Sequence, residues 1–190
     1  MATAFQKKKL TYFFDIMDVD GNGTIQLDDF SDMAEKVRQM MHFEEGSKEH
    51  KRIVEKATRF FHALIKDIEP SNQQEITKEE WLSFFDLEKM PKEMLVEYKE
   101  IVFNFMFDFF DQNRDGYISR KEYEDFYKIF GINTQFLDEA FPKLDSSNAY
   151  KLHRYDVMDA VEDFFISDDE EDSGNWIFGN WESLPHQRTT

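Results

Sequence analysis

Two short segments of this chain repeat the same spacing of oxygen-bearing side chains. The first reads DVDGNGTIQLDD, from Asp18 to Asp29, and the second reads DQNRDGYISRKE, from Asp111 to Glu122. In both, an acid or amide stands at positions 1, 3 and 5, glycine at 6, isoleucine at 8 and an acid at 12. A backbone that turns sharply at the glycine brings these oxygens together. The repeated pattern therefore predicts two loops that each wrap around a hard cation.

The frame of the first loop is decided by its glycine. Asp15, Asp18 and Asp20 could each be the first ligand. A start at Asp15 or Asp20 leaves position 6 without a glycine, whereas a start at Asp18 places Gly23 there. Only the last frame fits.

This arrangement is the calcium loop of the EF-hand type. Such a loop uses side-chain oxygens at positions 1, 3 and 5, a backbone carbonyl at 7 and a carboxylate at 12. We call residues 18–29 loop I and residues 111–122 loop III. The predicted metal ligands are Asp18, Asp20, Asn22, Thr24 and Asp29 in loop I, and Asp111, Asn113, Asp115, Tyr117 and Glu122 in loop III.

EF-hand loops pair through a short β-bridge at position 8, so each of these loops needs a neighbour. Residues 69–80 (loop II) place Ile76 at that position, and residues 145–156 (loop IV) place Leu152 there. Both segments also end on an acid at position 12. We interpret them as the two structural partners.

The partner loops have poor ligand sets. Gln74 and Tyr150 replace the glycine at position 6, and Ala149 offers no side-chain oxygen at position 5. Thr77 and Glu80 form a capping-box pattern, which explains Glu80 without a ligand role. Loops II and IV are therefore predicted to be degenerate and to bind no ion.

Apolar residues at helical spacing flank all four loops. The sequence predicts an all-α fold of four EF-hand units in two lobes, packed into one compact body with short β-bridges between paired loops. Residues 1–88 form the first pair and 89–166 the second, divided by EKMPKE at 88–93. Residues 167–190 form an acidic and then aromatic tail. Its two tryptophans, Ile177 and Phe178 predict that it folds back onto the core, with 185–190 loose.

Composition excludes several classes of protein. Forty acidic against 23 basic residues give a net charge of −17, which repels nucleic acid and anionic membranes. The chain has no cysteine and no apolar run of about 18 residues, so neither thiolate sites nor a transmembrane helix are expected. No catalytic arrangement stands out, and His62 is expected to be a core residue. We expect a cytoplasmic, non-enzymatic monomer without stable membrane insertion.

The loops and the tail sequence FFISDDEEDSGNWIFG together resemble the sarcoplasmic calcium-binding protein family, which includes calexcitin and calerythrin. The resemblance covers roughly residues 5 to 180. It implies a compact calcium buffer or signal modulator that commonly binds two or three ions. It supports the ligand residues of loops I and III, and it does not extend to loops II and IV.

Two other functions remain open. A calmodulin-like sensor would bind target helices through an exposed methionine-rich groove. A relative of the coelenterazine-binding proteins and photoproteins would hold an aromatic ligand in a central cavity. The candidates to line that cavity are His62, Trp81, Trp176 and Trp181.

The two good loops differ at position 12, where loop I has Asp29 and loop III has Glu122. Aspartate is one methylene shorter and reaches an ion less easily with both oxygens. A smaller, six-coordinate shell suits magnesium better than a seven-coordinate one. The hypothesis is that loop I accepts both calcium and magnesium, while loop III prefers calcium.

Overall fold

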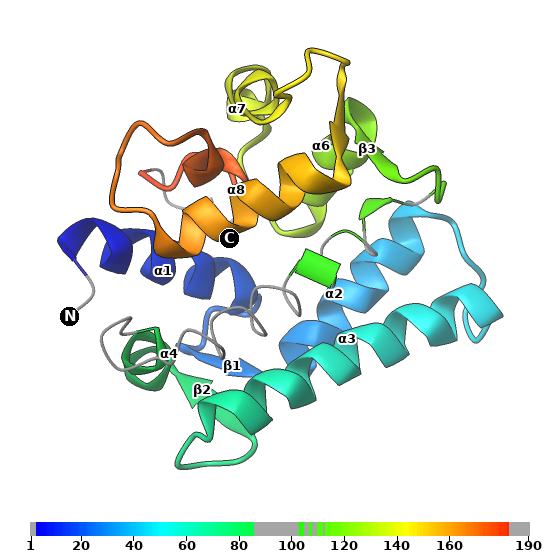
Figure 1. Ribbon diagram of the computed structural model, residues 1–190. Coiled ribbons are helices and arrows are strands. Elements are labelled where there is room, and N and C mark those ends of the chain that lie inside the picture. Colours follow the sequence, from blue (N-terminus) through cyan, green and yellow to red (C-terminus); the bar gives the residue numbers. More distant parts are fainter. Residues whose placement is uncertain (1–2, 86–102, 105–106, 108–109, 112, 183–190) are drawn as a thin grey trace.

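The structure is a computed structural model that describes residues 3–85, 103, 104, 107, 110, 111 and 113–182. Figure 1 shows how its elements are arranged. The α-helices in the described residues are α1 (Ala4–Met17), α2 (Leu27–Met40), α3 (Lys48–Ile68), α4 (Lys78–Phe84), α6 (Arg120–Ile129), α7 (Leu137–Leu144) and α8 (Arg154–Ile166). The expected helix before loop III lies largely outside the described residues. The predicted linker at 88–93 and the loose end at 185–190 lie wholly outside them.

Short strands cross each pair of loops. They are β1 (Thr24–Gln26), β2 (Glu75–Thr77), β3 (Tyr117–Ser119) and β4 (Lys151–His153). β1 pairs antiparallel with β2, with Ile25 opposite Ile76, and β3 pairs antiparallel with β4, with Ile118 opposite Leu152. These four side chains are buried. The predicted all-α fold and its β-bridges at position 8 are therefore confirmed.

The acid at position 12 of every loop is also the third residue of the helix that follows. In loop II, the Glu80 carboxylate accepts a hydrogen bond from the Thr77 backbone N–H, and the Thr77 hydroxyl accepts one from the Glu80 N–H. Ser119 and Glu122 form the same capping box at the start of α6. This reciprocal pair satisfies backbone donors that a helix start leaves open. The position-12 acid thus has a structural role whether or not a metal binds.

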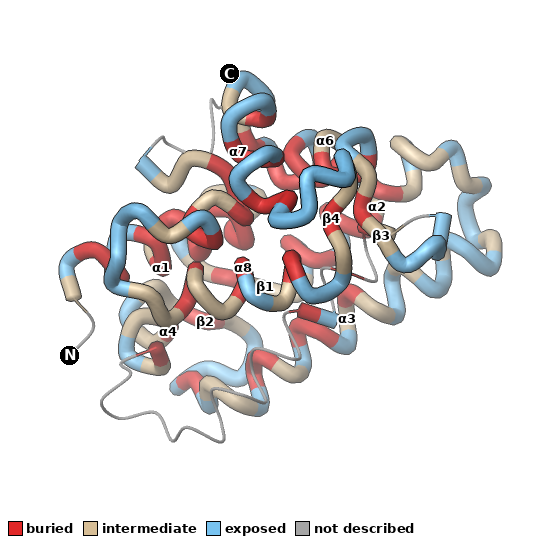
Figure 2. Tube along the Cα trace, turned by 45° about the horizontal axis from the view of Figure 1, so that its top comes forward, coloured by how far each residue is buried: buried red, intermediate tan, exposed pale blue. Residues whose placement is uncertain are grey.

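Aromatic side chains join the two halves of the chain. The ring of Phe13 in α1 lies 5.4 Å from that of Phe165 in α8, and Phe85, after α4, stacks on Phe165 at 5.2 Å. Trp81 is fully buried and donates a hydrogen bond from Nε1 to the Leu10 carbonyl at 3.0 Å. Figure 2 shows buried residues on the helix sides that face each other. The helices of both halves therefore share one core.

The tail returns to this core after α8. It forms a short 3-10 helix, η2 (Ser173–Trp176), and Phe178 beyond it is 1% exposed. The Phe178 ring lies 4.4 Å from Phe13 and 4.6 Å from Phe164. The Tyr123 hydroxyl of α6 donates to the Ile177 carbonyl at 2.9 Å. The tail therefore contacts helices from both halves.

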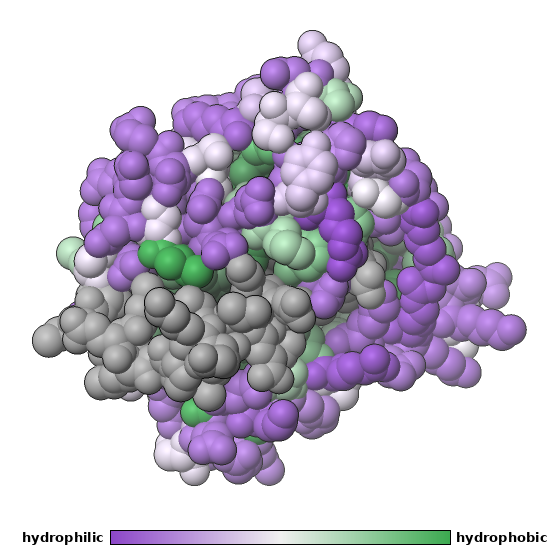
Figure 3. Space-filling model, in the orientation of Figure 1, coloured by the Kyte–Doolittle hydropathy of each residue, from purple (hydrophilic) through white to green (hydrophobic). Residues whose placement is uncertain are grey.

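The described part of the face shown in Figure 3 is mostly hydrophilic. Among the described residues, the large hydrophobic side chains that are exposed are Val54, Tyr150 and Tyr155. The ring of Tyr155, near the start of α8, stacks on His153 at the surface, with ring centres 5.0 Å apart. None of the described helices has the length and apolar character needed to cross a membrane.

Candidate metal centre

The structure brings three predicted ligands of loop I together. One carboxylate oxygen from each of Asp18, Asp20 and Asp29 lies within 4.8 Å of the others. Across the described residues, no second group of acidic or histidine side chains gathers as closely. Asp18 and Asp29 are also nearly buried, at 5% and 2% exposed. Burial raises the pKa of the Asp29 carboxyl, and the charge of Asp20 acts in the same direction. A divalent cation would relieve this repulsion.

The backbone of loop I holds these carboxylates in place. Gly21 and Gly23 have φ angles of 69° and 91°, which favour glycine. The resulting turn directs the N–H groups of Asn22 and Gly23 at the two carboxylate oxygens of Asp18, at 3.0 and 2.9 Å. At the far end, Asp29 accepts from the Gln26 N–H at 2.7 Å. Loop I is thus preorganised by its own amides.

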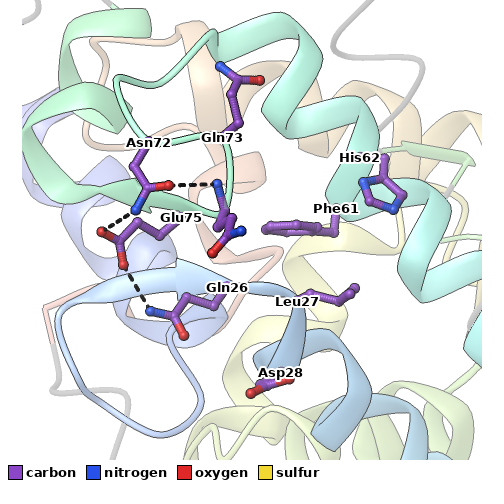
Figure 4. Close-up of a pocket in the computed structure, with 9 residues that line it drawn as sticks. Gln26, Leu27, Asp28, Phe61, His62, Asn72, Gln73 and Glu75 are labelled. Carbon is purple, nitrogen blue, oxygen red and sulfur yellow. Dashed lines mark hydrogen bonds between the residues drawn. The ribbon is translucent and has the colours of Figure 1, made fainter.

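Two further residues of loop I are engaged with their neighbours. Asn22 donates through Nδ2 to Asp20 at 2.9 Å, and its Oδ1 atom accepts from the Thr24 N–H at 2.9 Å. Gln26 at position 9 donates through Nε2 to Glu75 of loop II at 3.0 Å (Figure 4). Gln26 was not among the predicted ligands, and it links the two loops across the sheet.

Loop III repeats this hydrogen-bond pattern. The N–H groups of Asp115 and Gly116 donate to the two carboxylate oxygens of Asp111, each at 3.0 Å. Arg114 and Gly116 have φ angles of 60° and 84° at the positions that Gly21 and Gly23 hold in loop I. Burial raises the pKa of Asp111, and the charges of Asp115 and Glu122 add to the effect.

The remaining predicted ligands of loop III surround the same turn. Asn113 donates through Nδ2 to Asp115 at 3.2 Å, and the Tyr117 N–H donates to Asp115 at 3.0 Å. Glu122 is 6% exposed and accepts from the N–H groups of Asn113 and Ser119, at 3.3 and 2.8 Å. The donor set of both loops consists of carboxylate, amide and carbonyl oxygens, which fits calcium or magnesium.

Loop II lacks the turn found in loops I and III. Of its twelve residues, all described, only Glu69 has a positive φ. The carboxylate of Glu80 accepts from both the hydroxyl and the N–H of Ser71, at 2.6 and 2.8 Å. The Ser71 hydroxyl, followed by backbone N–H groups of Thr77 and Ser71, lowers the pKa of Glu80 to about 2. Glu122 of loop III accepts the same kinds of hydrogen bond, so the feature that sets loop II apart is the missing turn.

Loop IV keeps the turn although it has lost the glycine. Asn148 and Tyr150 have φ angles of 54° and 58°, and the N–H of Tyr150 donates to Asp145 at 2.7 Å. Ala149 supplies no oxygen at position 5, and the Ser146 hydroxyl hydrogen-bonds to Asp156. The sequence-based prediction did not include this retained turn. Asn148 was the signal for it, because asparagine tolerates a positive φ.

The residues considered for an aromatic-ligand cavity have separate neighbours. His62 is exposed and borders an open pocket of about 400 Å³ beside loops I and II (Figure 4), so the expectation of a core histidine was wrong. His62 lies on the solvent-exposed side of α3. Trp81 bonds to α1, the Trp176 ring lies under the ammonium of Lys143, and Trp181 packs edge-on against Phe5.

Comparison with known proteins agrees with this geometry. A family model for the EF hand matches residues 106–127, and a model for an EF-hand domain pair matches residues 1–36. Calerythrin of Saccharopolyspora erythraea is 24% identical over 172 residues, covering 86% of this chain and 94% of that protein. The chain therefore carries EF-hand sequences around loops I and III, and it is similar to calerythrin over most of its length. The two family-model matches contain loops I and III, the loops that have glycine at position 6.

Solved structures share the fold of this EF-hand protein. A sarcoplasmic calcium-binding protein from amphioxus is 19% identical, with a TM-score of 0.72 over 94% of this chain and 98% of that one. The calcium-loaded apo form of the coelenterazine-binding protein from Renilla muelleri is 20% identical, with a TM-score of 0.74 over 93% and 96%. These likenesses show that the chain has the same fold as these proteins.

Proposed function

We propose that this chain binds two calcium ions, one in loop I and one in loop III, and acts inside the cell as a monomeric calcium buffer or signal modulator. The observation that carries the proposal is the close approach of the Asp18, Asp20 and Asp29 carboxylates in a turn built by backbone amides. Loop III repeats the same amide pattern around Asp111.

Binding would act on the stability of the fold. Asp29 and Asp111 both have pKa values raised by burial, so their ionised forms are unfavourable without a counter-charge. A calcium ion supplies that charge. Because the unfolded chain has no preformed loop, calcium stabilises the folded state by mass action.

Loops II and IV act as structural partners in this proposal. In each, a serine hydroxyl donates to the position-12 carboxylate, from Ser71 to Glu80 and from Ser146 to Asp156. A serine hydroxyl also reaches the position-12 acid of loop III, from Ser119 to Glu122, so loops II and IV differ by their poorer ligand sets. The value of these loops lies in the β-bridges, through which they hold loops I and III.

The buried methionines favour a buffer over a calmodulin-like sensor. A sensor exposes a methionine-rich groove when calcium binds. Met17 and Met33 are almost completely buried, and Met40, Met41 and Met158 pack half-buried against the core. The tail covers aromatic residues of α1 and α8, where Phe178 contacts Phe13 and Phe164. A protein partner would have to displace this tail.

Isothermal titration with calcium, with and without magnesium, tests the ion count. We expect two ions for the native chain and one for Glu122→Gln, which removes a carboxylate charge from loop III. Glu80→Gln is the matched control in loop II and should leave two ions. A count of two after Glu122→Gln, or of one after Glu80→Gln, would contradict the ligand assignment.

A hydrophobic dye separates a buffer from a sensor. We expect little change in dye fluorescence when calcium is added, because the aromatic core stays covered. A strong calcium-induced rise would instead support the sensor. Size-exclusion chromatography of the same samples should give the mass of a monomer with and without calcium.

A further inference from the structure

A basic pocket of about 490 Å³ opens beside loop III. Its charged walls come from Arg52 and Lys56 of α3, Arg114 of loop III and Arg154 at the start of α8. Phe107 and Asp111 also line it. In a chain with 40 acidic and 23 basic residues, four bases here face a single acid. The local charge is therefore opposite to that of the whole protein.

The arginines of this pocket have no carboxylate partner among the described residues. Elsewhere the bases pair readily, as Arg59 does with Glu55 at 2.7 Å on the same helix α3. Arg52, Arg114 and Arg154 form no such ion pair within the described part of the chain. The carboxylate of Asp111 is occupied by the N–H groups of Asp115 and Gly116. Ion pairing with Asp111 therefore does not account for the presence of these three arginines.

Arg154 is held by uncharged groups. Its Nη2 atom donates to Asn104 Oδ1 at 2.8 Å, and its guanidinium carbon lies 4.5 Å from the centre of the Phe103 ring and 5.2 Å from that of Phe107. Stacking on aromatic rings fixes the plane of the guanidinium, and no carboxylate of the described residues pairs with its charge. This is the arrangement of a side chain that is positioned to receive an anion.

We propose that the basic pocket binds a small tetrahedral oxyanion, the phosphate group of a phosphate monoester or a sulfate group. The planar donor fork of arginine matches the paired oxygens of such a group. A volume of about 490 Å³ exceeds that of the anion alone and leaves room for a small organic body next to Phe107. The net charge of −17 disfavours large polyanions and anionic membranes, so the ligand is a free small molecule.

Calcium in loop III should strengthen this binding, an inference that rests on the proposed function. Asp111 lines the pocket and is also the first predicted ligand of loop III. Without a metal its negative charge opposes an incoming anion, and a divalent ion reverses that local charge. By thermodynamic linkage the anion must raise the calcium affinity of loop III by the same factor. The two ligands would therefore bind cooperatively.

The test uses ¹⁵N-labelled full-length protein titrated with methyl phosphate, a monoester that lacks a second phosphate to chelate calcium. NMR follows the Nε–Hε signals of the arginines, with excess calcium and with a chelator. We expect the signals of Arg52 and Arg154 to shift on titration and that of Arg59 to stay. Affinity should fall several-fold when calcium is removed.

Charge-matched variants show whether the pocket itself binds. Arg52→Gln should weaken methyl phosphate binding by roughly fivefold, the upper range for an exposed ion pair. Arg59→Gln removes another exposed charge from the same helix outside the pocket and should change little. Equal weakening by both variants, or no shift at Arg52 and Arg154, would overturn the proposal.

Two further measurements show whether the phosphate group belongs to a free molecule or to a lipid, and whether Arg52→Gln leaves calcium binding intact. Phosphatidylcholine vesicles with and without phosphatidic acid should both fail to bind, and binding only to the acidic vesicles would overturn the free-ligand proposal. Calcium titration of Arg52→Gln should still give two ions. If the native chain bound methyl phosphate equally with and without calcium, the coupling between the two ligands would be overturned. If calcium titration gave fewer than two ions, the proposed function would be overturned.

Discussion

Lys9 of α1 donates a hydrogen bond to the Oδ1 atom of Asn175 in η2 across 2.6 Å, and both side chains have no exposed surface. The Lys9 ammonium also donates to the carbonyls of Asp163 and Ser167, at 3.2 and 2.9 Å. Asn175 in turn donates to the Asp169 carbonyl at 2.8 Å. One buried cation thus joins the first helix, the end of α8 and the tail.

Removal of the Asn175 side chain should loosen the tail. Asn175→Ala leaves the buried Lys9 ammonium without its closest acceptor. We expect the free energy of unfolding to fall by about 3 kcal/mol, as when one partner of a buried charge is lost. Urea denaturation measures this change, with Asn72→Ala in exposed loop II as a control that loses less than about 1 kcal/mol. Similar losses in both variants would show that Asn175 has no special role.

The stability of the protein should depend on pH through Lys9. Burial lowers the pKa of Lys9 from 10.5 to about 8, although Asp172, Asp163 and Asp168 act in the opposite direction. Below pH 8 the lysine is protonated in both states and contributes no slope. Between about pH 8 and 10 the unfolded chain binds more protons than the folded one, so this lysine makes stability rise with pH.

The comparison with Lys9→Met isolates this effect. We expect the free energy of unfolding of the native chain, measured by urea denaturation without calcium, to rise from pH 8 to 10 relative to that of Lys9→Met. Above pH 10 the stability of both proteins should fall together and their difference should level off, because burial raises the pKa of Tyr12 and Tyr123, which keep protons that the unfolded chain loses. Parallel pH profiles for the two proteins would contradict the assignment to Lys9.

Gly174 allows the tail to approach α8 closely. A Cβ atom there would lie 2.4 Å from the Cβ of Asp163 and 2.8 Å from the carbonyl oxygen of Ala160. Gly174→Ala should therefore push the tail outward and lower the free energy of unfolding by about 3 kcal/mol. The matched control is Gly46→Ala, where φ is 74° but the space is open, with an expected loss of about 1 kcal/mol.

Hydrogen exchange locates the change caused by Gly174→Ala. The amides of Ile177 and Gly179 donate to carbonyls of η2, at 3.0 and 2.8 Å, and should exchange faster in this variant. Unchanged exchange of these two amides would show that the tail tolerates the extra methyl group in place.

The ion preference of loop I should depend on the length of its last acid. Asp29→Glu adds one methylene and allows both oxygens to reach a larger ion, so calcium affinity should rise relative to magnesium affinity. Glu122→Asp in loop III is the reciprocal change and should shift preference toward magnesium. Competition titrations measure both. If neither exchange alters the ratio of the two affinities, the position-12 residue does not set ion preference.

The sequence by itself determined the loops. The frame that begins at Asp18 follows from spacing within one EF-hand unit, because each loop positions its own residues through local backbone turns. The pairing of Ile25 with Ile76 follows from their shared position 8 in two such loops. The prediction that the tail at 167–190 folds onto the core rested only on the aromatic and apolar residues it contains. Thr77 and Glu80 were recognisable as a capping box for the same local reason.

Only the tertiary structure decided what distant residues do. Lys9 and Asn175 are 166 residues apart in the chain, and neither belongs to a motif. The basic pocket likewise combines α3, loop III and α8, whose charges look scattered in sequence. His62 lay beside apolar residues in sequence yet faces solvent, because the packing of α3 sets which side of the helix is buried. Such contacts depend on how helices pack, and packing is set by the whole core and not by local spacing.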